Sequence, residues 1–125
     1  HIIYFGLENW WAGDRESFTM LTPSRYNIDA VEDTEVLLTT YEHLDRLKNS
    51  IPAISKMFTT MDQRSYIATQ KRIHASISLT AEERYQELSK NYPDFLQRFP
   101  QNMIASYLGI SAETLSRIRK KALSK

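Results

Sequence analysis

The 125-residue sequence contains no cysteine, three glycines and four prolines. Without cysteine the chain forms neither disulfides nor thiolate metal sites, and a cytoplasmic location is the simplest expectation. The three glycines stand far apart, at positions 6, 13 and 109, so no glycine-rich phosphate loop or dinucleotide-binding fingerprint is present. The sequence also lacks an apolar run long enough to cross a bilayer, and we expect no membrane partner.

Catalytic patterns are missing as well. The three histidines, His1, His43 and His74, lack the spacing of metal ligands. No nucleophile motif accompanies them. We therefore expect no catalytic residue, no metal site and no enzymatic activity.

Charge is distributed unevenly along the chain. Six basic residues and one acidic residue lie from Arg98 onward, so this end carries +5, and the first 97 residues carry −4 of a net charge of +1. An acidic body with a basic end suits a protein that presents that end to a polyanion.

Residues 100–121 have the pattern of two short helices joined by a tight turn. Ile104 and Leu108 are four residues apart and form one inward stripe. Gly109 stands where the first helix must end, because glycine adopts a left-handed conformation at little cost. Ser111 is a good N-cap for the second helix. The pattern predicts a helix-turn-helix with its recognition helix at about 111–122.

The rest of the C-terminal part, residues 80–125, reads as helical. Thr80 and Glu83 form a capping box that opens a helix, and Pro93 is expected to end that segment. We therefore assign residues 80–125 to a DNA-binding domain.

A long helix is expected before this domain, from Pro52 to about Leu79, within residues 51–79. At 1.5 Å per residue it would span about 42 Å, which is too long for a small domain to cover. A second copy of the helix is the expected partner. The near-heptad positions that would form this dimer interface are Ile54, Met57, Met61 and Ala68.

Residues 1–50 read as β structure followed by a short helix. The β-formers of residues 1–5, 26–30 and 34–40 predict strands, and residues 41–48 predict the helix. So few strands cannot bury both faces of a sheet. The chain also begins at His1 rather than Met, so we expect the front half of a β domain upstream. The predicted fold class is therefore α+β.

These features together resemble the Crp/Fnr family of transcription regulators. The likeness is strongest over Ile110–Lys120, and Val31–Val36 is similar to the last strand of the family's cyclic-nucleotide-binding β roll. The resemblance implies a partial β roll, a long dimerisation helix and a C-terminal helix-turn-helix. By position, Glu113 and Arg117 would contact bases, while the family's arginine before Glu113 is replaced by Ala112. The phosphate contacts that the resemblance implies are Ser111, Thr114, Ser116 and Lys120.

The effector pocket implied by the resemblance departs from the family pattern. Phe5-Gly6-Leu7-Glu8 is similar to the cassette that holds a cyclic nucleotide, but Leu7 replaces its acid and Glu8 comes one residue late. Ser24 stands at the position of the phosphate-pairing arginine, and Arg25 follows one step on. In a strand, one step turns the side chain to the other face. We therefore expect no cyclic nucleotide cofactor, and this loop serves as scaffold or holds another effector.

Two functions remain open from the sequence. The first is a dimeric, sequence-specific regulator that binds double-stranded DNA, with RNA polymerase as a candidate further partner. The alternative is a ligand-sensing or dimerisation module whose helical end docks onto protein. The basic outward face around Arg117 favours DNA, because a protein-docking helix would show an apolar stripe there.

Overall fold

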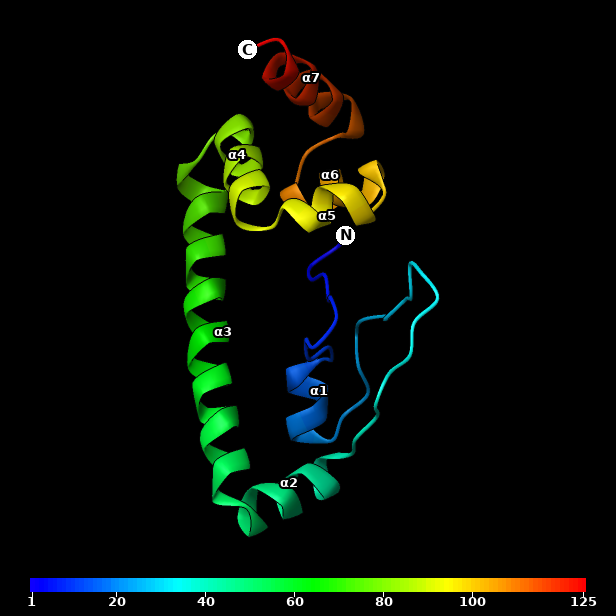
Figure 1. Ribbon diagram of the computed structural model, residues 1–125, viewed down its shortest axis with the longest axis vertical. Helices are drawn as coiled ribbons and strands as arrows, with labels where there is room; N and C mark the ends of the chain where they lie inside the picture. The colour runs from blue at the N-terminus through cyan, green and yellow to red at the C-terminus, as the bar shows by residue number, and fades with distance from the viewer. The chain divides into compact units, whose positions relative to one another are not determined.

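The computed structural model describes residues 1–125, and its regular structure consists of seven helices with no strand (Figure 1). The helices are α1 (Arg15–Met20), α2 (Tyr41–Ser50), α3 (Pro52–Ser78), α4 (Ala81–Asn91), α5 (Pro93–Arg98), α6 (Gln101–Leu108) and α7 (Ala112–Leu123). The prediction of an α+β fold with a partial β roll is therefore wrong, and the chain is all-α.

The predicted strands fail because no neighbouring segment supplies their backbone hydrogen bonds. Residues 26–38 contain strand-forming side chains, yet they run as irregular chain. Val36, Leu37 and Leu38 are 65%, 101% and 92% exposed, respectively. A β-former stabilises a strand only when it packs against cross-strand neighbours, so propensity alone does not produce a sheet here.

The chain divides into two compact units. The N-terminal unit comprises Gly6–Ile67, and the C-terminal unit comprises His1–Phe5 together with Ala68–Lys125. The long helix α3 contributes to both.

The N-terminal unit has a small core. Its buried side chains are Leu44 of α2 and Phe58 of α3. The Trp11 ring meets Phe58 edge-on at 4.8 Å, and the ammonium of Lys48 lies 5.3 Å from the centre of the Phe58 ring. Asp14 is the N-cap of helix α1, and its carboxylate accepts a hydrogen bond from the Ser17 amide at 3.2 Å.

The C-terminal unit has a larger core, formed by α4 to α7. Its buried side chains are Phe5, Tyr85, Leu88, Phe95, Ile104, Ala105, Leu108 and Leu115. The N-terminal residues lie beside α5 and α6 (Figure 1). There Phe5 stacks on Phe99 with ring centres 4.0 Å apart and meets Phe95 edge-on at 5.2 Å. The residues predicted as a first strand therefore act as an extended segment that packs on helices.

Two features of α4 and α5 bear on the sequence predictions. The capping box at Thr80 and Glu83 is confirmed, and it opens α4. Pro93 does end that segment, but it also begins α5 at the first helical position, where a missing N–H costs nothing. The segment that starts at Pro93 is thus a short helix in its own right.

Candidate nucleic-acid interface

The turn between α6 and α7 depends on Gly109. Its backbone is left-handed, with φ 69° and ψ 33°. The Gly109 N–H donates to the Ser106 carbonyl at 3.1 Å, and the Ile110 N–H donates to the Ala105 carbonyl at 3.0 Å. These two bonds form a Schellman motif, which satisfies carbonyls at the end of α6. The predicted turn glycine is confirmed.

Helix α7 starts from a side-chain cap. The Ser111 hydroxyl oxygen accepts from the Thr114 N–H at 3.1 Å, as the sequence predicted. Leu115 is fully buried against the C-terminal core, and α6 and α7 pack on each other. The cap, the turn and this anchor hold α7 in one orientation relative to α6.

The predicted DNA-contacting residues lie together along α7. Thr114 is half-buried, and the exposed ones are Ser111, Ala112, Glu113, Ser116, Arg117 and Lys120. Glu113 lies in the first turn of the helix, where a carboxylate is favourable, and Lys120 lies in the last, where a cation is favourable. The outward face thus combines hydroxyls, one acid and two cations that can reach a polyanion.

Two lysines at and just beyond the end of α7 lie against a carboxylate that the sequence did not indicate. The Glu82 carboxylate accepts a hydrogen bond from Lys121 Nζ at 2.8 Å and lies 3.8 Å from Lys125 Nζ. The hydrogen bond from Lys121 is the main reason why the pKa of Glu82 lies below its usual value. Glu82 precedes Lys121 by 39 residues, so only the packing of α4 near the end of α7 reveals the pairing.

Helix α6 also contacts the N-terminal segment and α3, and the sequence did not indicate these contacts. The Ile2 N–H donates to Ser106 Oγ at 2.9 Å. Arg72 of α3 donates to the Tyr107 carbonyl at 3.1 Å, and its guanidinium carbon lies 3.9 Å from the centre of the Tyr107 ring. Arg72 also donates to the Ile3 carbonyl. These contacts fix the N-terminal segment and the end of α3 against α6.

The predicted effector-pocket residues all belong to the N-terminal unit, where they lie before and after α1. Gly6, Leu7 and Glu8 precede α1, and a hydrogen bond from the Trp10 N–H to the Leu7 carbonyl closes a turn there at 3.1 Å. Ser24 donates to Asp14 at 2.8 Å. This bond is the main reason why the pKa of Asp14 lies below its usual value.

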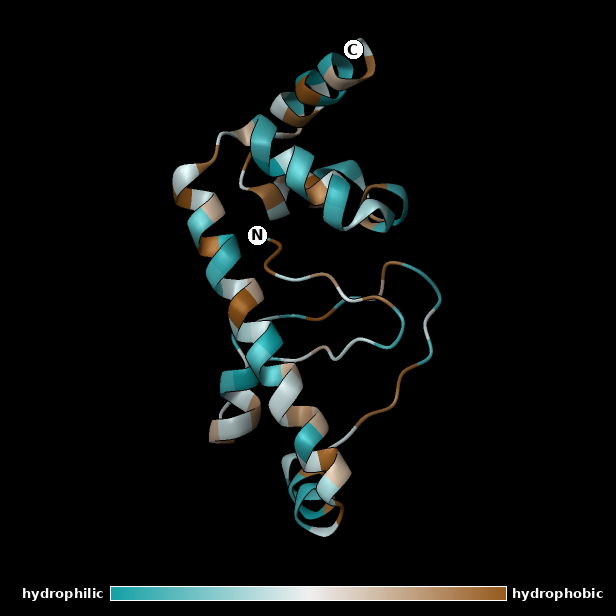
Figure 2. Ribbon diagram, turned by 60° about the vertical axis from the view of Figure 1, so that its left-hand side comes forward, coloured by the Kyte–Doolittle hydropathy of each residue, from teal (hydrophilic) through white to brown (hydrophobic).

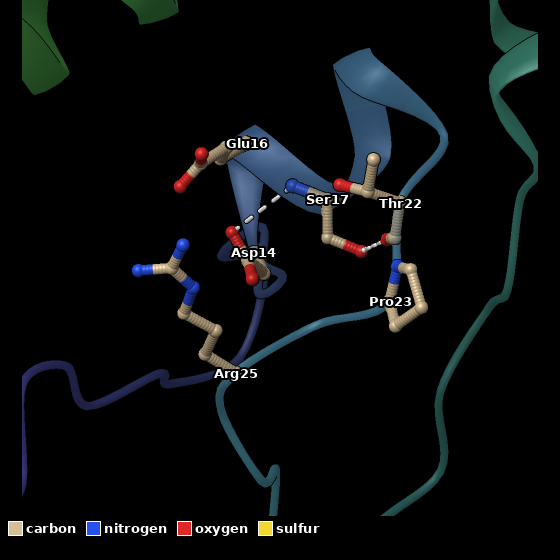
Figure 3. A pocket seen from close by; sticks show the side chains of 6 residues that line it. All are labelled: Asp14, Glu16, Ser17, Thr22, Pro23 and Arg25. Atoms are coloured by element: carbon tan, nitrogen blue, oxygen red, sulfur yellow. Dashed lines mark hydrogen bonds between the residues drawn. The ribbon is translucent and has the colours of Figure 1, made fainter.

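Of the predicted pocket residues, Arg25 alone lines the nearby cavity of about 220 Å³ (Figure 3). The other lining residues are Asp14, Glu16, Ser17, Thr22 and Pro23. Ligand pockets typically measure about 300–1,000 Å³, so this cavity is small. Two carboxylates beside one guanidinium also make it a poor site for a phosphate.

The four predicted dimer residues differ in exposure along α3. Ile54 and Met61 are half-buried within the chain, whereas Met57 and Ala68 are exposed. Phe58 is the only buried side chain of this 27-residue helix. Hydrophobic and hydrophilic residues alternate along it (Figure 2), and apolar side chains remain exposed at Tyr66, Ile73 and Ile77.

The structure shows neither a metal-binding cluster nor a helix that could cross a membrane. No group of three or more histidine, aspartate or glutamate side chains is placed to hold a metal ion. None of the helices is both long enough and apolar enough to cross a membrane.

Comparison with known proteins identifies one relative. The chain is 25% identical over 100 residues to the transcriptional regulatory protein btr of Bordetella pertussis, covering 71% of this chain and 41% of that protein. It thus spans less than half of that relative's length. No protein-family profile matches the chain, and no solved structure matches it. The resemblance to the Crp/Fnr family is therefore not upheld, because no family profile matches and the β roll that it implied is absent. The chain is distantly similar to a transcriptional regulatory protein.

Proposed function

We propose that this protein is a transcription regulator that binds double-stranded DNA in a sequence-specific manner through α7. The supporting observation is the outward face of α7, where the predicted contact residues are gathered on a helix fixed by Gly109, the Ser111 cap and buried Leu115. The distant similarity to a transcriptional regulatory protein agrees with this proposal. Such a regulator would act in the cytoplasm.

Arg117 and Glu113 are the proposed base-reading residues. Both are exposed and lie four residues apart, on one face of α7. Arginine pairs with two acceptors of guanine, and glutamate accepts from the amino group of cytosine. Ser111, Ser116 and Lys120 would contact phosphates and fix the register.

The test compares Arg117→Ala with Lys120→Ala on duplexes selected from a random-sequence library. Arg117→Ala should lose discrimination at one base pair of the site, at a cost of about 1–3 kcal/mol. Lys120→Ala should weaken binding to all sequences alike and reduce the salt dependence. Uniform weakening by Arg117→Ala would refute its base-reading role. An absence of DNA binding by the unmodified protein would favour the alternative, a module that docks onto protein.

We further propose that α3 pairs with α3 of a second copy, so that the protein binds DNA as a homodimer. The support is a helix of about 40 Å in length, at 1.5 Å per residue, which has one buried side chain. Two recognition helices related by a two-fold axis would read half-sites about 10 base pairs apart, and the operator would be a near-palindrome.

Met57→Glu tests the dimer, because Met57 is exposed and its replacement does not disturb the chain's own core. The variant should sediment as a monomer and lose its preference for the whole palindrome over one half-site. Thr59→Glu is the matched control, since position 59 lies about 200° around the helix from position 57. A dimeric Met57→Glu variant would place the interface elsewhere, and a monomeric unmodified protein would refute the proposal.

A further inference from the structure

The side chains of Ser111, Thr114 and Arg117 form a continuous hydrogen-bonded chain along the start of α7. Ser111 Oγ donates to Thr114 Oγ1 at 2.9 Å, and Arg117 Nη2 donates to the same oxygen at 3.3 Å. Positions 114 and 117 are three residues apart, so their side chains are neighbours on one helix face. The Thr114 hydroxyl is therefore the shared acceptor of this chain.

With Ser111 as the donor, the hydrogen bonds around Thr114 orient its hydroxyl. Ser111 Oγ accepts from the Thr114 N–H, so the Ser111 hydroxyl hydrogen is available for Thr114 Oγ1. A threonine hydroxyl has two lone pairs and one hydrogen. With both lone pairs occupied by Ser111 and Arg117, the remaining hydrogen of Thr114 can donate only away from these two partners.

Thr114 is better fixed than the arginine that it contacts. Its side chain is half-buried and β-branched, which restricts rotation about χ1, and the next residue, Leu115, is fully buried. Arg117 is exposed, and an unrestrained arginine side chain loses much rotamer entropy when it becomes ordered. Because the Thr114 oxygen already restrains Arg117, the arginine loses less rotamer entropy when it binds.

We propose that Thr114 is a positioning residue for Arg117: its hydroxyl oxygen holds the guanidinium in place on the outward face of α7 before DNA binds. This inference rests on the proposed DNA-binding function and refines the role of Thr114, which position alone had suggested to be a phosphate contact. The ligand is the same DNA duplex, and Thr114 acts on its recognition through Arg117.

The experiment measures the affinity of the full chain for a duplex selected from a random-sequence library and for a scrambled duplex of the same length. Thr114→Val keeps the shape but removes the acceptor. It should reduce affinity for the selected duplex by roughly threefold to tenfold, the value of one hydrogen bond, with a smaller change for the scrambled duplex. Thr114→Ser restores the hydroxyl and should restore the affinity. Ser124→Ala is the matched control, because it removes a hydroxyl that lies beyond α7 and outside the proposed DNA contacts, and it should leave discrimination between the two duplexes unchanged.

A double-mutant cycle decides between positioning and direct contact. In the Arg117→Ala background, Thr114→Val should have no further effect on discrimination. An undiminished effect in that background, or a failure of Thr114→Val to change discrimination, would overturn the inference while leaving the proposed function intact. If the unmodified protein does not distinguish the two duplexes, the proposed function itself fails. Circular dichroism of each variant shows whether its total helix content equals that of the unmodified protein.

Discussion

Replacing Gly109 tests whether the turn between α6 and α7 depends on backbone conformation alone. A Cβ added at Gly109 would meet no atom within 4 Å, so Gly109→Ala creates no clash. The penalty comes from the left-handed backbone at φ 69°, which costs an L-residue about 1–2 kcal/mol. Alanine also has fewer conformations than glycine in the unfolded chain, and this effect offsets about 0.4–1 kcal/mol of the penalty. The expected net destabilisation is therefore about 1 kcal/mol.

Urea denaturation followed by circular dichroism measures this loss, and a thermal melt should show a decrease of about 4–8 °C for a unit of this size. Gly13→Ala is the matched control, because Gly13 also has open space around it but has no positive φ. It should change stability by no more than about 1 kcal/mol, in the stabilising direction. Trp10 and Trp11 both belong to the N-terminal unit, so their fluorescence follows that unit separately.

Two results would refute this reasoning. A loss well above about 2 kcal/mol, the upper bound of the left-handed penalty, would mean that the substituted side chain is crowded after all. No loss at all would mean that position 109 does not hold a left-handed conformation. Gly109→Asn gives a further check, since asparagine tolerates this conformation better than alanine and should be less destabilising.

Three further predictions concern stability. Leu21 has φ 56° and is 74% exposed, so Leu21→Gly should raise the free energy of unfolding by up to about 1 kcal/mol in urea denaturation, and Leu21→Val should lower it. Leu115→Ala should cost about 2–5 kcal/mol because the side chain is fully buried, whereas Leu123→Ala, at an 85% exposed position, should change stability by less than about 0.5 kcal/mol. The hydrogen bond from the Thr80 N–H is the main reason why the pKa of Glu83 lies below its ordinary value of 4.5. The stability that ionised Glu83 provides is therefore present above pH 4.5 and is lost as the pH falls through the lowered pKa. Acid titrations of stability should show that Glu83→Gln removes this part of the pH dependence, and an unchanged acid transition would contradict the assignment.

The features that the sequence determined by itself depend on residues within a few positions of each other. The capping box at Thr80 and Glu83, the left-handed Gly109 and the Ser111 cap are local hydrogen-bonding motifs, and all three occur as predicted. The long helix α3 likewise begins at Pro52, as predicted, and ends at Ser78, next to the predicted end at about Leu79. Helical hydrogen bonds join residues four positions apart, so local sequence carries enough information to specify them.

Only the tertiary structure decided the features in which a residue pairs with a segment far away in the sequence. The β-formers of residues 1–5, 26–30 and 34–40 found no strand to pair with, which made the predicted sheet wrong. Phe5 instead packs on Phe95 and Phe99, about 90 residues further along the chain, and Glu82 holds Lys121 across 39 residues. A strand, an aromatic cluster and an ion pair each require two segments to meet, and which segments meet depends on the packing of the whole chain rather than on the propensity of either.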